Sequence, residues 1–85
     1  MDNIKNTIAI QIASLYSKYI DVESTEFDIL EFSNKILFDS FFRMILINEL
    51  YADIKHFTIR NYIKKSDSTK INDALEILSL LNNFF

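Results

Sequence analysis

The chain has 85 residues, 49% of them hydrophobic and 25% charged, a balance that is typical of a single ordinary globular domain, residues 1–85, and not of a disordered or membrane protein. With no cysteine and a single histidine, it has no thiol nucleophile, no disulfide and no ligand set for a transition metal. Its net charge of −3 also makes nucleic acid an unsuitable partner, because phosphate binding needs a basic face.

The N-terminal stretch MDNIKNTIAIQIASLY lacks the continuous apolar core and the cleavage site of a signal peptide, and no apolar run approaches the length of a membrane span. We therefore expect a cytoplasmic protein with no membrane insertion. The sequence contains neither Gly nor Pro. Turns must therefore be formed by Asn, Asp, Ser and Thr, whose side chains bond to nearby backbone groups.

The first predicted element is an amphipathic helix over about residues 3–20. Its apolar stripe, at helical spacing, comprises Ile4, Ile8, Ile12, Leu15 and Tyr19, widened by Ala9, Tyr16 and Ile20. Residues 21–35 are polar and rich in turn-forming residues, which predicts a long connection that isolated apolar residues hold against the core. Within this connection, the pair Thr25 and Asp28 is typical of a capped helical turn.

A long helix is predicted over residues 40–56, with the Ser40 hydroxyl at its N-cap. Its predicted core face carries Leu46, Ile47, Leu50, Ile54 and Phe57. Its opposite face carries Phe41, Met44, Ile45, Asn48 and Ala52. A helix that is apolar on both sides is either buried on both sides or reserves one for a partner. Arg43 falls on the inward side, where its stem can lie on the core while the guanidinium reaches water.

A short helix is predicted next, over residues 59–65, followed by a break at residues 66–69. A last helix is predicted over residues 69–81, with inward residues Ile71, Ala74, Leu75, Leu78 and Leu81. The outline is an all-α four-helix bundle with a long first connection and a short third helix.

One polar pair, Asp39-Ser40, interrupts the otherwise apolar stretch ILFDSFFRMILINEL of residues 36–50. The simplest interpretation is an ordinary helix cap. The chain contains a second pair, Asp67-Ser68, inside the polar stretch KKSDSTK, which we interpret as a turn and cap. The first pair differs from the second because an apolar helix follows it at once.

The segment around this pair, FSNKILFDSF at residues 32–41, resembles the F-x-x-x-L-G-x-D-S-L segment of the acyl carrier protein family. The matching positions are Phe32, Ile36, Asp39, Ser40 and Phe41. The predicted helix order is also similar to that family over most of the chain. Within the family, LFDSF is most similar to the D-alanyl carrier proteins and to stand-alone peptidyl carriers.

The resemblance implies a bundle of acyl-carrier-protein type with 4′-phosphopantetheine attached to Ser40, where the far end of the arm holds an acyl or aminoacyl group as a thioester. Such a protein is not itself an enzyme, and we expect a monomer. The implied partners are a phosphopantetheinyl transferase, a loading enzyme that adenylates or transfers the acyl group, and a downstream synthase or transferase. The implied recognition residues are Asp39, Phe41, Met44, Ile45 and Asn48.

Some positions depart from the family pattern. Lys35 and Leu37 replace the usual acid and glycine, and apolar residues follow Ser40 where the family carries acids. We therefore expect a dedicated partner enzyme that contacts an apolar surface. Two alternatives stay open. One is a carrier-like domain that is no longer modified, and the other is a small helical adaptor or inhibitor, of the antitoxin or immunity type, that binds a protein through the same apolar face without a cofactor.

Overall fold

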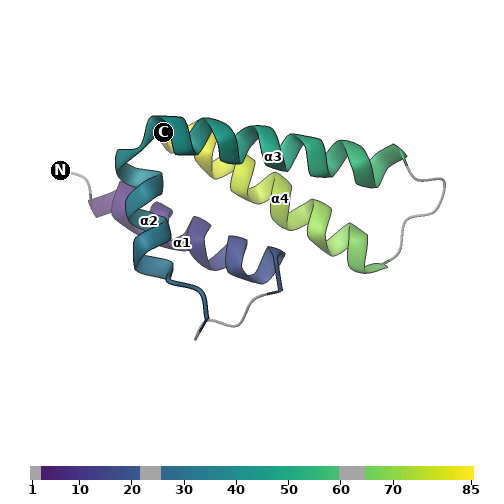
Figure 1. The fold of residues 1–85 in the computed structure, drawn as a ribbon, viewed down its shortest axis with the longest axis horizontal. Coiled ribbons are helices and arrows are strands. Elements are labelled where there is room, and N and C mark those ends of the chain that lie inside the picture. Colours follow the sequence, from purple (N-terminus) through teal and green to yellow (C-terminus); the bar gives the residue numbers. More distant parts are fainter. Residues whose placement is uncertain (1–2, 22–25, 60–64) are drawn as a thin grey trace.

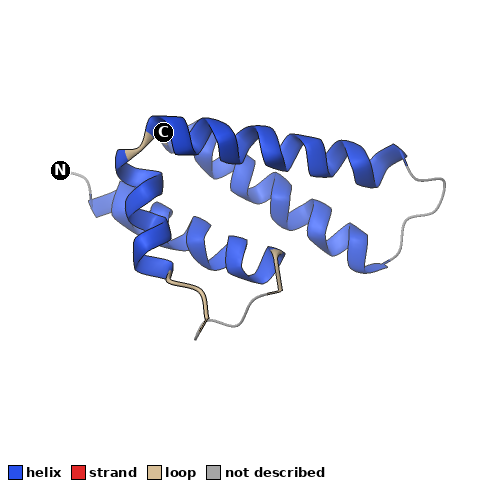
Figure 2. Ribbon diagram, viewed as in Figure 1, coloured by secondary structure: helices blue, strands red, loops and turns tan. Residues whose placement is uncertain are grey.

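Helices account for nearly all of the residues that the structure describes. The computed structural model describes residues 3–21, 26–59 and 65–85, without the side chains of residues 59 and 65–67. Within these ranges the elements are α1 (Asn3–Tyr19), α2 (Ile29–Phe38), α3 (Ser40–Ile59) and α4 (Lys65–Phe84). Figure 2 shows helices and no strand in this part of the chain. The predicted all-α four-helix class is therefore confirmed.

The helices contact one another in the order α1, α2, α3, α4 and back to α1. Figure 1 shows α3 and α4 running side by side, with the C-terminus returning to the start of α3. The short helix α2 crosses one end of the bundle steeply, against both α1 and α3. All four helices contribute to one core, which comprises Ala9, Ile12, Tyr19, Ile36, Leu46, Leu50, Ala74, Ile77, Leu78 and Leu81.

The position of the short helix differs from the prediction. Helix α2 occupies part of the stretch that was expected to be a long connection. Asp28 starts it, because its carboxylate accepts the N–H of Glu31 at 2.9 Å, and Ile36 anchors it by full burial. The expected cap residue Thr25 lies outside the described residues. The connection before α2 is therefore shorter than predicted.

The predicted short helix over residues 59–65 falls largely outside the described residues, since Ile59 ends α3 and Lys65 begins α4. The break that we predicted at residues 66–69 is wrong, because these residues are in the first turns of α4. The helical backbone at Asp67 and Ser68 likewise corrects the interpretation of this pair as a turn.

The predicted core faces of α1 and α4 are largely confirmed and differ from the structure at single positions. In α4, Leu75 is 49% exposed and Ile77 is buried in its place, because the buried residues follow the spacing i, i+3, i+4 and i+7 from Ala74. In α1, Ile4 is 68% exposed, and the small side chain of Ala13 is buried instead. Most of the predicted α1 face is nevertheless confirmed. The residues in the core or packed against it are Ile8, Ala9, Ile12, Leu15, Tyr16 and Tyr19.

Helix α1 ends without a glycine, as the composition requires. Asp21 adopts a positive φ of 58°, and its N–H donates to the carbonyl of Lys18 at 3.1 Å. A short polar side chain tolerates this left-handed conformation better than an apolar one does. Asp21 therefore takes the left-handed conformation that glycine commonly adopts at the end of a helix.

Candidate functional site

A single residue, Asp39, separates α2 from α3. Its backbone is extended (φ −121°, ψ 97°), and its N–H donates to the carbonyl of Lys35 at 3.0 Å, which closes α2. Its carboxylate accepts the N–H of Phe42 at 3.0 Å, and its carbonyl accepts the N–H of Arg43 at 3.1 Å. Asp39 is therefore the N-cap of α3. We refer to residues 36–43 as the corner.

Ser40 is the first residue of α3 and not its cap, so the predicted capping role of the Ser40 hydroxyl is wrong. Both residues of the pair are good capping residues, and the carboxylate of Asp39 takes the N–H of Phe42. The Ser40 side chain is exposed, and its hydroxyl makes no hydrogen bond within the described part of the chain. The fold therefore does not use this hydroxyl.

Arg43 connects α3 to the end of α2 at the corner. As the sequence predicted, it lies on the inward side of α3. It is half-buried, and its Nη1 atom donates to the carbonyl of Ile36 at 2.6 Å and to that of Leu37 at 3.3 Å. Carbonyls in the last turn of a helix have no partner within the helix, so the guanidinium satisfies the end of α2. The guanidinium carbon also lies 5.4 Å from the centroid of the Phe85 ring, which brings the end of α4 to the corner.

An open groove of about 340 Å³ lies between α3 and α4, beside Ser40. Its lining residues are Ser40, Arg43, Met44, Ile47, Leu81, Asn82 and Phe85. Ser40 begins α3 and Arg43 reaches back to the last turn of α2, so a hydroxyl and a cation both occupy the corner end of this groove. The remaining walls are mostly apolar.

The outer face of α3 is apolar and uncovered. Phe41 is 64% exposed, Met44 is 50% exposed and Ile45 is 47% exposed. We call these three residues the apolar patch. Asn48 and Ala52 continue the same exposed face, while Leu46, Leu50, Ile47, Ile54 and Phe57 are buried or half-buried on the inward side. The two faces that periodicity predicted for this helix are confirmed.

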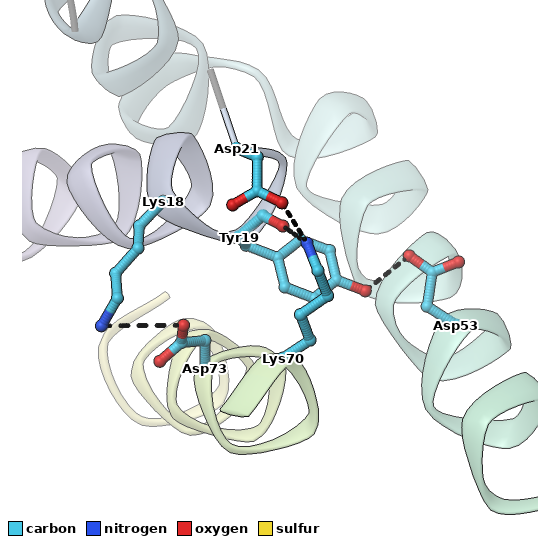
Figure 3. Close-up of polar contacts among 6 residues, drawn as sticks. All are labelled: Lys18, Tyr19, Asp21, Asp53, Lys70 and Asp73. Atoms are coloured by element: carbon cyan, nitrogen blue, oxygen red, sulfur yellow. Dashed lines mark hydrogen bonds and ion pairs between the residues drawn. The ribbon is translucent and has the colours of Figure 1, made fainter. Parts of the chain in front are cut away.

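A polar cluster away from the corner joins α1, α3 and α4 (Figure 3). The Tyr19 hydroxyl donates to Asp53 Oδ2 at 2.8 Å, across 34 residues of sequence. The Lys70 ammonium donates to the Tyr19 carbonyl at 2.6 Å and to Asp21 Oδ2 at 3.1 Å. Lys18 forms an ion pair with Asp73 at 3.9 Å in the same view. The cluster therefore closes the end of α1 against its neighbours.

A second tyrosine extends this connection towards α2. The Tyr16 hydroxyl donates to Glu49 Oε1 at 2.9 Å, and its ring stacks on Phe32 at 4.8 Å. Burial, followed by the hydrogen bonds to Glu49 and Asp53, raises the pKa of both Tyr16 and Tyr19 above its usual range. Helical periodicity does not predict these bonds. The only signal for them was two tyrosines three apart on α1 and two acids four apart on α3.

No protein-family model, curated protein or solved structure matches the chain. Among the described residues, no group of three or more His, Asp or Glu side chains is placed to hold a metal ion. Within the same ranges, no helix has both the length and the apolar character needed to cross a bilayer. The candidate site therefore consists of the corner, the groove beside it and the apolar patch.

Proposed function

We propose that the chain is a stand-alone carrier protein that holds an acyl or aminoacyl group on a 4′-phosphopantetheine arm attached to Ser40. The observation that carries this proposal is the exposed Ser40 hydroxyl in the first turn of α3, next to an aspartate that already caps the helix. A hydroxyl that the fold does not use is available for modification. The carrier acts in the cytoplasm as a monomer and is not itself an enzyme.

The chemistry of loading suits this position. The Ser40 oxygen forms a bond to the phosphorus of the pantetheine phosphate, and the pyrophosphate bond of coenzyme A breaks to release the nucleotide. The transferase takes up the proton of the hydroxyl. The resulting phosphodiester lies at the N-terminal, positive end of the α3 dipole, where an exposed anion gains roughly 0.3–1 kcal/mol. The arm then supplies the reactive thiol, so the protein needs only to present it.

The arrangement agrees with the carrier family in one respect and departs from it in another. The shared feature is a serine that follows an aspartate and begins a long helix with a continuous core face. The departure is the short helix α2, which directly precedes Ser40 where the family pattern has a long connection. The proposal therefore rests on the serine and its surroundings and not on the helix order.

Partner contact is assigned to the surface next to the serine. Asp39 assists recognition by the phosphopantetheinyl transferase, and the apolar patch together with Asn48 contacts the loading enzyme and the downstream synthase or transferase. The residues of this face are not acidic; they are Phe41, Met44, Ile45 and Asn48. We therefore propose partner enzymes with an apolar docking surface, because desolvating apolar side chains at the centre of an interface contributes most of its affinity.

The intact mass of the chain after incubation with coenzyme A and a broad-specificity phosphopantetheinyl transferase tests this proposal. We expect a gain of one phosphopantetheine in the wild-type chain and no gain in Ser40→Ala. Ser68→Ala is the matched control, because Ser68 is an exposed serine that also follows an aspartate near a helix start, and it should be modified like the wild type. A wild-type chain that gains no mass, or a gain that persists in Ser40→Ala, contradicts the proposal.

The apolar patch also supports a second candidate, a helical adaptor or inhibitor that binds one protein partner without a cofactor. Three large apolar side chains exposed on the same face of one helix are typical of an interaction surface. In this case Ser40→Ala has no effect on co-purification of the partner, and Met44→Asp abolishes it. Leu75→Asp is the matched control, since Leu75 is 49% exposed against 50% for Met44 but lies on α4.

A further inference from the structure

Arg43 has a position that its structural role explains only in part. Its guanidinium reaches from α3 to the carbonyls of Ile36 and Leu37, so it lies at the N-terminal end of its own helix. Long side chains on a helix point towards the helix N-terminus, which is the direction observed here. The same direction takes the guanidinium towards Ser40, three residues earlier in the first turn.

The hydrogen bonds of Arg43 leave part of its guanidinium uncommitted. Nη1 donates to the two carbonyls of α2, whereas a guanidinium has five N–H donors on three nitrogens. Within the described ranges, no carboxylate forms an ion pair with Arg43, and no side-chain nitrogen is both buried and without a partner. The remaining donors therefore face the groove or solvent.

The charges around the corner leave Arg43 as the cation nearest to the serine in sequence. The Asp39 carboxylate is the acid next to Ser40, and it is engaged by the N–H of Phe42. Lys35 forms an ion pair with Glu31 at 3.7 Å on α2. Arg43 and Ser40 line the same groove, whose other lining residues have uncharged side chains.

We infer that Arg43 binds the phosphate group carried on Ser40, through the guanidinium donors that α2 leaves free. This inference rests on the proposed function, because it assigns that phosphate to the phosphodiester of the arm. A guanidinium offers two parallel donors to phosphate oxygens, and such charge-assisted pairs are stronger than neutral hydrogen bonds. Arg43 is thus a positioning residue that fixes where the arm leaves the protein, at the corner end of the groove.

The geometry can be tested without any transferase, in the full chain with phosphoserine incorporated at position 40. We expect phosphorus NMR to show a lower second pKa of the phosphoserine in the wild-type background than in Arg43→Gln, by roughly 0.5–1 unit, since a nearby cation favours the dianion. Arg43→Lys should give an intermediate value. Phosphoserine at position 68 is the matched control, and Arg43→Gln should not change its pKa.

A second measurement needs no substitution at Arg43 and is independent of any loss of stability. The Nε–H resonance of Arg43 should shift when phosphoserine replaces Ser40, and it should shift again when the attached phosphate is titrated. An unmoved resonance in a folded chain, or equal pKa values in the wild type and in Arg43→Gln, overturns the inference. A purely structural arginine that holds only α2 gives this result.

The two proposals fail in different experiments. If the transferase modifies Ser40 but Arg43 has no effect on the phosphoserine pKa, the carrier function stands and the role of Arg43 is lost. If the transferase does not modify Ser40 but the pKa depends on Arg43, the arm is excluded and Arg43 still binds a phosphate on this serine.

Discussion

The corner and the polar cluster at the end of α1 use similar side chains in opposite ways. In the polar cluster, the Tyr19 hydroxyl, the Asp53 carboxylate and the Lys70 ammonium each bond to another part of the chain. At the corner, Asp39 bonds to the backbone, but the neighbouring Ser40 hydroxyl makes no bond in the described structure. The first region closes the bundle, whereas the second presents groups to solvent.

The apolar side chains follow the same contrast. The ring of Phe32 on α2 lies between those of Tyr16 on α1 and Phe42 on α3, with centroid distances of 4.8 Å and 5.2 Å. Phe41, next in sequence to Phe42, is 64% exposed. Packing between the helices means that these three rings contribute to the stability of the fold. An exposed Phe41 does not stabilise the fold in this way. We therefore assign the function to the corner and the apolar patch.

Raising the pH should produce the largest change in the free energy of unfolding. This change arises from the two tyrosines that bond to acids on α3. The pKa of Tyr16 and that of Tyr19 are raised in the folded chain, so the unfolded chain loses its tyrosine protons first. The stability that these groups contribute is complete below the unfolded tyrosine pKa of about 10 and declines as the pH rises above it. Urea unfolding at pH values on both sides of 10 measures this decline. In the Tyr16→Phe, Tyr19→Phe double variant, most of this decline in stability with rising pH should disappear.

Tyr19→Phe should have the next largest effect at neutral pH. The substitution removes the hydrogen bond to Asp53, and a bond to a charged group contributes about 1.5–3 kcal/mol to the free energy of unfolding. Urea denaturation gives this difference directly. Tyr16→Phe is the matched variant and should cost less, because its bond to Glu49 is exposed to solvent. Equal losses would show that the cluster does not derive its strength from burial.

Asp39→Ala should destabilise the corner by about 1 kcal/mol, the usual loss for an N-cap. Asp39→Asn retains an acceptor oxygen at the same place and should restore most of the stability. The free energies of unfolding of the two variants, compared with the wild type, test whether Asp39 acts as a cap. If Asn is as damaging as Ala, the negative charge and not the hydrogen bond is what the corner requires.

Ser40→Ala should have the smallest effect on stability, within about 0.5 kcal/mol, because an exposed residue that makes no bond is replaced by a better helix former. Ser33→Ala provides the contrast, since Ser33 is buried and its hydroxyl donates to the Leu30 carbonyl at 2.9 Å. A clear destabilisation by Ser40→Ala in the thermal midpoint would mean that the fold does use this hydroxyl.

The sequence predicted those features that depend on local periodicity. The inward face of α3 and the exposed apolar patch follow from the positions of Leu46, Leu50 and Met44 within one helix. Helix α2 was missed because its apolar residues are interrupted by Glu31, Ser33, Asn34 and Lys35, which also suit a surface connection.

The sequence could not predict features that depend on a single residue or on partners far apart in the chain. Asp39 and Ser40 are both good capping residues, and the choice between them shifts the start of α3 by one position. The bond from Tyr19 to Asp53 spans 34 residues, so only the three-dimensional arrangement of α1 and α3 reveals it. The helix class and the two faces of α3 were thus predictable, whereas the hydrogen bonds at the start of α3 were not.

The connection through Asp39 has a mechanical consequence. Because a single non-helical residue lies between α2 and α3, the connection is too short to let the two helices move independently. Longer loops can absorb the displacement of one helix relative to the next, but here the Asp39 and Arg43 bonds transmit it. We therefore expect a molecule that displaces α2 to move the first turn of α3 as well, and with it the hydroxyl of Ser40.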